Sequence, residues 1–189
     1  MIQQRTPKAN WWLVVGMMSL VSLALTGCTL LPGTPILPTP VRPPDLQSTA
    51  DALRAATEGI YPLNALSIHY EVGNPAGEGR TSLTADGDGQ LEVTFERGSQ
   101  YERWQSKLSE AEFLSLVRLL VEHTVWNVQS QRETGVPDEA YHTLTVEAEG
   151  FEPLITGLWA GEVQDHPDFR PIRDVLTGLA REVSGGLAP

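Results

Sequence analysis

The sequence predicts an α+β domain in which an antiparallel sheet of about five strands carries two helices on one face, in the order βββαββα. Alternating apolar and polar residues mark short strands, and apolar residues at helical spacing mark two amphipathic helices. Each helix follows a run of strands and must bury its apolar stripe against them. We expect one domain over residues 61–186, which is enough chain to bury one core.

The first three strands are expected to form a meander. Residues 66–72 alternate between apolar positions and polar ones, and His69 lies on the polar side. A glycine-rich loop leads to a second strand over 80–85, and a third follows over 91–96. The segment Asp86-Gly87-Asp88-Gly89 joins them, and an Asp-Gly pair in this position is typical of a hairpin whose glycine accepts the positive φ of a primed turn.

A capping box predicts where the first long helix begins. Ser109 precedes the helix and Glu112 follows three residues later, so each side chain can satisfy a free backbone amide. The apolar stripe that follows is wide enough to cover one face of a sheet. It consists of Phe113, Leu116, Val117 and Leu120. We expect this helix to end near residues 123–126.

Two more strands and a helix complete the domain. After the polar stretch 129–139, alternation predicts a fourth strand over 141–148, and a less regular fifth strand covers 154–159. The last helix is expected to begin at Asp168 as N-cap and to end at Gly185-Gly186. Its apolar stripe comprises Phe169, Ile172, Val175, Leu176, Leu179 and Val183.

The first 28 residues have the layout of a secretory signal. Arg5 and Lys8 supply positive charge, residues 11–25 are largely apolar, and small residues precede the only cysteine. The segment Leu25-Thr26-Gly27-Cys28 resembles the lipobox of bacterial lipoproteins. The resemblance implies that residues 1–27 are a signal peptide. It also implies that Cys28 is lipidated through a thioether, becomes the first mature residue and carries acyl chains such as palmitate.

The same segment predicts that the protein is anchored to a membrane, and an uncleaved membrane helix is the alternative to a lipid anchor. Residues 11–31 are about as long as the roughly 20 residues that a membrane-spanning helix needs, so an uncleaved helix would also explain them. Either interpretation carries the rest of the chain to the extracytoplasmic side of the cell envelope. Thr29 is not the aspartate of inner-membrane retention, so the resemblance implies the outer membrane if the host has two membranes.

Residues 28–60 are expected to tether the domain. Six prolines between 29 and 44 favour polyproline II, which would make a semi-rigid spacer of roughly 50 Å. A proline-rich recognition ligand is the alternative. Apolar residues near helical spacing predict a short helix within 45–60.

The charge of the chain limits its partners. Removal of residues 1–27 takes away Arg5 and Lys8 and no acid, so the net charge falls from −11 to about −13. Such an acidic surface disfavours nucleic acid and anionic lipid heads. We therefore expect contact with the membrane through the lipid anchor alone, and with an envelope protein as partner.

No cofactor or metal site is predicted. The segment 73–81 resembles a phosphate loop, but its glycine spacing is one residue too long and it joins two strands. Asp86, Asp88 and Gln90 begin like a calcium loop, but the required later glycine and glutamate are replaced. We interpret both segments as turns. Trp104, Trp126 and Trp159 are interpreted as core or rim aromatics.

Two functions remain open from the sequence. The first is a non-enzymatic binding or assembly module, with its contact surface on the loop 129–139 or on the strand face opposite the helices. A faint similarity to uncharacterised bacterial lipoprotein domains, through the Asp-Gly hairpin ahead of a helix, implies no activity. The alternative is a small envelope hydrolase that uses dispersed side chains. Its candidate residues are Glu122, His123, His142 and His166.

Overall fold

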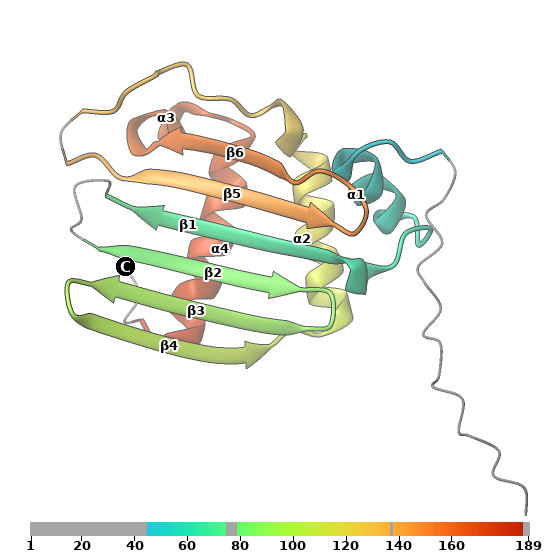
Figure 1. Ribbon diagram of the computed structural model, residues 1–189, viewed down its shortest axis with the longest axis horizontal. Coiled ribbons are helices and arrows are strands. Elements are labelled where there is room, and N and C mark those ends of the chain that lie inside the picture. Colours follow the sequence, from blue (N-terminus) through green and yellow to red (C-terminus); the bar gives the residue numbers. More distant parts are fainter. Residues whose placement is uncertain (1–44, 75–78, 137, 187–189) are drawn as a thin grey trace, which may run out of the picture. The chain divides into compact units, whose positions relative to one another are not determined.

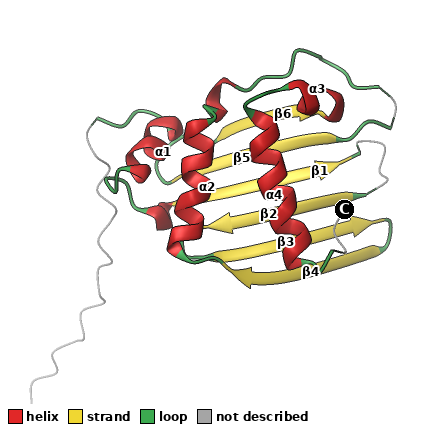
Figure 2. Cartoon of the chain, turned by 180° about the vertical axis from the view of Figure 1, so that it is seen from behind, coloured by secondary structure: helices red, strands yellow, loops and turns green. Residues whose placement is uncertain are grey.

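The computed structural model describes residues 45–74, 79–136 and 138–186 of the chain. Within them, one six-stranded antiparallel sheet has the strand order β4-β3-β2-β1-β5-β6. The two long helices, α2 and α4, lie across one face of this sheet (Figures 1 and 2). The predicted α+β class is therefore confirmed, with six strands instead of about five. The predicted signal peptide, Cys28 and the proline-rich part of the predicted tether lie outside the described residues.

Every strand that the alternation predicts is present. β1 lies inside the sheet, because β2 pairs with one of its edges and β5 with the other. Apolar side chains of the inner strands face the helices, and polar side chains face away from them. The strands are β1 (Leu66–Gly73), β2 (Arg80–Asp86), β3 (Gln90–Arg97), β4 (Gln100–Lys107), β5 (Tyr141–Ala148) and β6 (Leu154–Trp159).

The strand that the sequence does not predict is β4. It pairs with β3 over its whole length, from Gln100 opposite Arg97 to Lys107 opposite Gln90. Six of its eight residues are exposed, and Trp104 is the residue that packs against the core. An edge strand that is open on both faces needs no apolar alternation, so its sequence carries no strand pattern.

The turn between β2 and β3 differs from the expected primed turn. The hairpin itself is confirmed, but three residues, 87 to 89, connect the strands. The amide of Gly89 donates to the carbonyl of Asp86 over 3.0 Å, and Gly89 has the positive φ of +83°. This is the three-residue hairpin, in which a left-handed residue follows a tight turn.

The helices contribute one buried stripe each. Phe113 of α2 and Phe169 of α4 are the two largest of the fully buried side chains. The short helix expected within 45–60 is present as α1, which buries Leu53 and packs against α2 and β5. The helices are α1 (Thr49–Thr57), α2 (Glu110–Glu122), α3 (Ala160–Asp165) and α4 (Phe169–Val183), with 3-10 turns η1 (Leu63–Ala65) and η2 (Val125–Asn127).

The ends of α4 confirm one prediction and correct another. Gly185 and Gly186 both have positive φ, and the amide of Gly186 donates to the carbonyl of Arg181, so the predicted glycine stop is confirmed. Asp168 occupies the N-cap position as predicted, but its side chain makes no capping hydrogen bond. The ring Nδ1 of His166 instead accepts from the amide of Phe169 over 3.3 Å.

The capping box of α2 is confirmed in both directions. The hydroxyl of Ser109 accepts from the amide of Glu112, and a carboxylate oxygen of Glu112 accepts from the amide of Ser109 over 2.7 Å. Both side chains are exposed, so the hydrogen bonds compete with water.

Ser109→Ala should lower the free energy of unfolding by about 1 kcal/mol, because an amide of the first turn loses its acceptor. Ser115→Ala in the same helix is the matched control, since Ser115 is also exposed but donates only to the carbonyl of Ala111. Urea midpoints measured on both variants test this. A midpoint for Ser109→Ala equal to that of Ser115→Ala would show that the box contributes no stability.

Candidate functional site

A pocket of about 490 Å³ lies where the start of α4 meets the end of α2, and we name it the α3–α4 pocket. Its walls come from the segment after η2, from β6 and from the turn between α3 and α4. The lining residues are Asn127, Gln129, Gln131, Leu158, Glu162, Asp165, His166, Pro167 and Asp168. It contains carboxamides, carboxylates and one imidazole, and no lysine or arginine lines it.

Of the four residues named for a hydrolase, His166 lines this pocket, and His123 lies close to Asp168, which also lines it. His123 ends α2, and its Nδ1 lies 3.8 Å from a carboxylate oxygen of Asp168. His166 lines the pocket, but its Nδ1 faces the amide of Phe169. The structure thus brings the end of α2 and the start of α4 together, while Glu122 is exposed and is not among the lining residues.

His142 lies elsewhere, in the layer between the sheet and α4. It is buried, and its Nδ1 is 2.7 Å from the hydroxyl of Tyr70 on the neighbouring strand. Burial, followed by the positive charge of nearby Arg173, lowers the pKa of His142 to about 4. Burial likewise raises the pKa of Tyr70 to about 12. A neutral imidazole bound to a neutral phenol is a core hydrogen bond, and His142 is not among the residues that line the pocket.

The remaining histidine belongs to the open sheet face. The ring Nδ1 of His69 lies 3.0 Å from the hydroxyl of Thr84 across the β1–β2 pair. Each of the four histidines therefore has a polar neighbour within the fold, as expected for structural histidines. These neighbours are Thr84 for His69, Asp168 for His123, Tyr70 for His142 and the amide of Phe169 for His166.

Two carboxylates hold the loop 129–139 against α3, which the sequence did not indicate. Glu139 accepts from Arg132 over 2.7 Å and from the amides of Gly161 and Val136. The Arg132 side chain, followed by the Gly161 amide, lowers the pKa of Glu139 to about 2. Glu162 accepts from the hydroxyl of Ser130 and from two backbone amides, so its carboxylate is already occupied.

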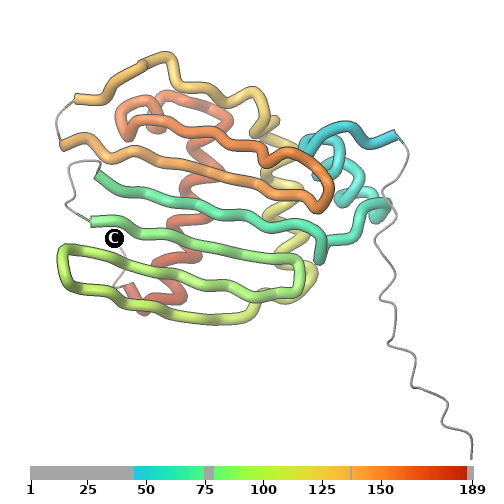
Figure 3. The backbone as a smooth tube through the Cα atoms, in the orientation of Figure 1, coloured from blue at the N-terminus to red at the C-terminus, as the bar shows by residue number. Residues whose placement is uncertain are grey.

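The same loop covers the outer edge of β6. The hydroxyl of Thr156 donates to the carbonyl of Val128 over 2.7 Å, and the ring of Trp159 lies against Gly135. Figure 3 shows the backbone from η2 to β5 running along this edge of the sheet. These contacts hold the described part of the loop against the domain. Pro137 lies outside the described residues.

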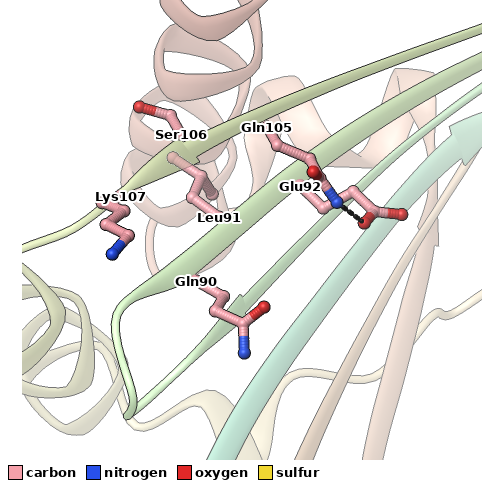
Figure 4. A pocket seen from close by; sticks show the side chains of 6 residues that line it. All are labelled: Gln90, Leu91, Glu92, Gln105, Ser106 and Lys107. Atoms are coloured by element: carbon pink, nitrogen blue, oxygen red, sulfur yellow. Dashed lines mark hydrogen bonds between the residues drawn. The ribbon is translucent and has the colours of Figure 1, made fainter. Parts of the chain in front are cut away.

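The open face of the sheet is polar, and its side chains bind one another across the strands. Ser82 and Thr94 are 2.6 Å apart, Ser67 donates to Glu147, and Gln105 donates to Glu92 (Figure 4). Ile155 and Tyr101 are exceptions, because their side chains are 68% and 58% exposed on this face. No helix covers this face among the described residues (Figures 1 and 2).

Metal and cofactor chemistry finds little support among the described residues. No group of three or more histidine, cysteine, aspartate or glutamate side chains there is placed to hold a metal ion. Asp86 uses its carboxylate to accept from the amide of Gln90, which is a turn contact. Trp104 and Trp126 are partly buried and pack against the core, and the guanidinium of Arg54 lies over the ring of Trp126 at 4.1 Å. Trp159 is also partly buried, and its ring lies 4.7 Å from that of Tyr141 between centroids. Part of the glycine-rich segment 73–81 falls outside the described residues.

The described helices are all too short or too polar to cross a membrane. A comparison with models of known protein families finds no match to this chain, and a comparison with curated proteins finds none either.

Proposed function

We propose that this protein is an envelope lipoprotein, anchored through lipid on Cys28, whose domain is a non-enzymatic binding or assembly module. The segment Leu25-Thr26-Gly27-Cys28, behind a basic and then apolar stretch, carries this proposal. Two or three acyl chains hold a protein far more firmly than one, at roughly 0.8 kcal/mol for each buried methylene. The proposed location is the extracytoplasmic side of the envelope, at the outer membrane where the host has one.

Three features of the domain support a binding module over a hydrolase. The histidines of the domain are engaged in hydrogen bonds or close pairs within the fold. The loop 129–139 and the open sheet face are largely polar surfaces of the kind that protein partners use. The acidic net charge favours a neutral or cationic partner over nucleic acid. The close pair of His123 and Asp168 is the remaining observation in favour of the hydrolase alternative.

Cys28→Ala should move the protein from the membrane fraction to a soluble or unprocessed form, because neither thioether formation nor cleavage can then occur. The measurement is detergent phase partition of cell fractions, combined with incorporation of labelled palmitate. Thr29→Ala is the matched control, and it should remain labelled and membrane-bound. Unchanged membrane retention of Cys28→Ala without any label on the parent chain would favour the uncleaved helix and would refute lipid anchoring.

A further inference from the structure

The two edges of the sheet differ in what covers them. The outer edge of β6 is covered by the segment after η2, through the Thr156 to Val128 hydrogen bond. The outer edge of β4 receives no hydrogen bond from any described residue outside β3. β4 is eight residues long, contains no proline, and keeps an unbroken register with β3. It therefore lacks several of the devices that usually blunt an edge strand.

The backbone pattern identifies the groups that this edge presents. The amide of Leu108 donates to the carbonyl of Gly89 on the β3 side. Backbone groups alternate in direction along an antiparallel strand, so the even-numbered residues of β4 bond β3 and the odd-numbered residues point outward. The outward residues are Tyr101, Arg103, Gln105 and Lys107. Four evenly spaced amides and carbonyls along one line are the chemistry that recognises another extended strand.

We propose that β4 pairs antiparallel with β4 of a second copy of this chain, about a twofold axis that passes beside Trp104. The two six-stranded sheets then continue into one. Both copies use the same patch of surface, as a closed twofold dimer requires. The outward residues of one copy meet the outward residues of the other, so the backbone groups of all four find partners.

Charge selects this register among those that keep side chains on matching faces. With the axis at Arg103, the Arg103 side chains of the two copies lie opposite each other. With the axis at Glu102, the two Glu102 side chains do so. An axis at Gln105 places Arg103 opposite Lys107 of the second copy. Like charges directly opposite one another destabilise a strand pair. With the axis at Trp104, each charged residue of β4 instead faces a neutral one.

The side chains of β4 fit the same register. Tyr101 is 58% exposed, which is unusual for a tyrosine within a strand, and it would face the ammonium and alkyl stem of Lys107 of the second copy. Arg103 would face Gln105, and both residues already bind Glu92 of their own chain. Glu92, Gln105 and Lys107 line a shallow hollow at the β3–β4 pair (Figure 4). On the helix side, the two partly buried Trp104 rings would meet at the axis.

Cysteines at positions 101 and 107 test this register in intact cells. Tyr101→Cys combined with Lys107→Cys places two thiols roughly 20 Å apart within one chain, because six residues of strand separate them. In the proposed pair, position 101 lies opposite 107 of the second copy, about 5.5 Å away between Cα atoms, which is within reach of a disulfide. Mild oxidation of whole cells should therefore convert the double variant into a covalent dimer, at least about tenfold more than either single variant.

The single variants are the matched controls, since each places its thiol roughly 20 Å from its own copy. They also reveal any crosslink made through Cys28, so the outcome does not depend on whether Cys28 carries lipid. Equal crosslinking of the double and single variants would overturn the proposed register. No crosslinking at all, with normal levels of the double variant, would overturn the dimer and would indicate that another segment covers β4.

A charge swap made in the double-cysteine variant tests the pairing of positions 103 and 105. Gln105→Arg places a second cation opposite Arg103 twice per dimer, and it should reduce crosslinking between positions 101 and 107 by about tenfold. Adding Arg103→Glu should restore the dimer, because a carboxylate then faces the new guanidinium across the axis. Restored crosslinking would exclude misfolding of β4 as the cause of the first loss, because a second charge change does not repair a misfolded strand. If Arg103→Glu does not restore crosslinking, the pairing of 103 with 105 is refuted.

Discussion

Gly87→Ala should lower the free energy of unfolding by on the order of 3 kcal/mol or more, the largest effect expected from adding one methyl group to this domain. A Cβ atom at Gly87 would lie 1.8 Å from the carbonyl oxygen of Leu63 and 2.6 Å from the amide nitrogen of Asn64. Both are backbone atoms of η1, so no side-chain rotation relieves the contact. The turn after β2 or the 3-10 turn before β1 must move, and the Gly87 to Leu66 hydrogen bond would weaken with it.

Gly178→Ala is the matched control and should have the opposite sign. Gly178 lies within α4, and a Cβ atom there would meet no atom within 4 Å. Alanine in a helix interior is favoured over glycine by up to about 1 kcal/mol. Thermal and urea unfolding of both variants measure the difference. A Gly87→Ala protein as stable as the parent would show that η1 yields to the turn at little cost.

The hairpin that contains Gly87 was predictable from the sequence, but the conformation of its turn was not. The Asp-Gly pairs between two alternating runs predicted the hairpin correctly, because alternation and turn composition are local properties. The conformation depends on more than those residues. Gly89 takes the left-handed backbone, while Gly87 is constrained by η1, which precedes β1 and reaches the turn only through the tertiary fold.

The same distinction explains the other differences between prediction and structure. The capping box at Ser109 was predicted because its two side chains are three residues apart and need no other part of the chain. β4 was missed because its exposed residues show no apolar alternation, and only pairing with β3 defines it as a strand. Asp168 was predicted as the cap of α4 from its residue type and position. Its carboxylate instead lies beside His123, and the ring Nδ1 of His166 accepts the hydrogen bond from the amide of Phe169.

The candidate site residues show the same difference between local signals and tertiary contacts. The alternation placed His142 correctly among the apolar residues of β5, so its burial was implied by the sequence. Its hydrogen bond to Tyr70 depends on the register between β1 and β5, which sets Val72 opposite His142 and Leu144 opposite Tyr70. Residues that are 72 positions apart carry no local signal of such a pairing. The α3–α4 pocket likewise exists only because α2 ends where α4 begins.

His142 should make the domain acid-labile over a defined pH range. Above pH 6.5 the imidazole is neutral in the folded and unfolded chain, so it adds no pH dependence. Between pH 6.5 and about 4 the unfolded chain binds a proton at this position and the folded chain does not, because the folded pKa of His142 is about 4. The free energy of unfolding should therefore fall as the pH falls, by on the order of 3 kcal/mol at pH 4.

The groups around His142 account for the sign. Burial removes the water that would solvate an imidazolium, and the guanidinium of Arg173 on α4 repels it. Tyr70 keeps its proton far above this range, so no phenolate is available to balance the charge. The carboxylate of Glu139, whose pKa is about 2, stabilises the fold above its ordinary pKa of 4.5 and loses that effect only as the pH falls from 4.5 towards 2. The two groups therefore act in largely separate windows.

His142→Asn should remove the slope between pH 6.5 and 4, because its amide occupies the position of Nδ1 beside the Tyr70 hydroxyl but does not titrate. The variant loses ring volume and should be less stable at pH 7 by about 1–2 kcal/mol, so the curves of the two proteins should converge or cross as the pH falls. Urea midpoints at pH 7, 6, 5 and 4 measure this. His69→Asn is the matched control, since His69 is partly exposed on the open sheet face and should leave the slope unchanged. If the free energy of unfolding of His142→Asn falls with pH as steeply as that of the parent, protonation of another group causes the loss of stability. The proposed role of the buried Tyr70–His142 pair would then be wrong.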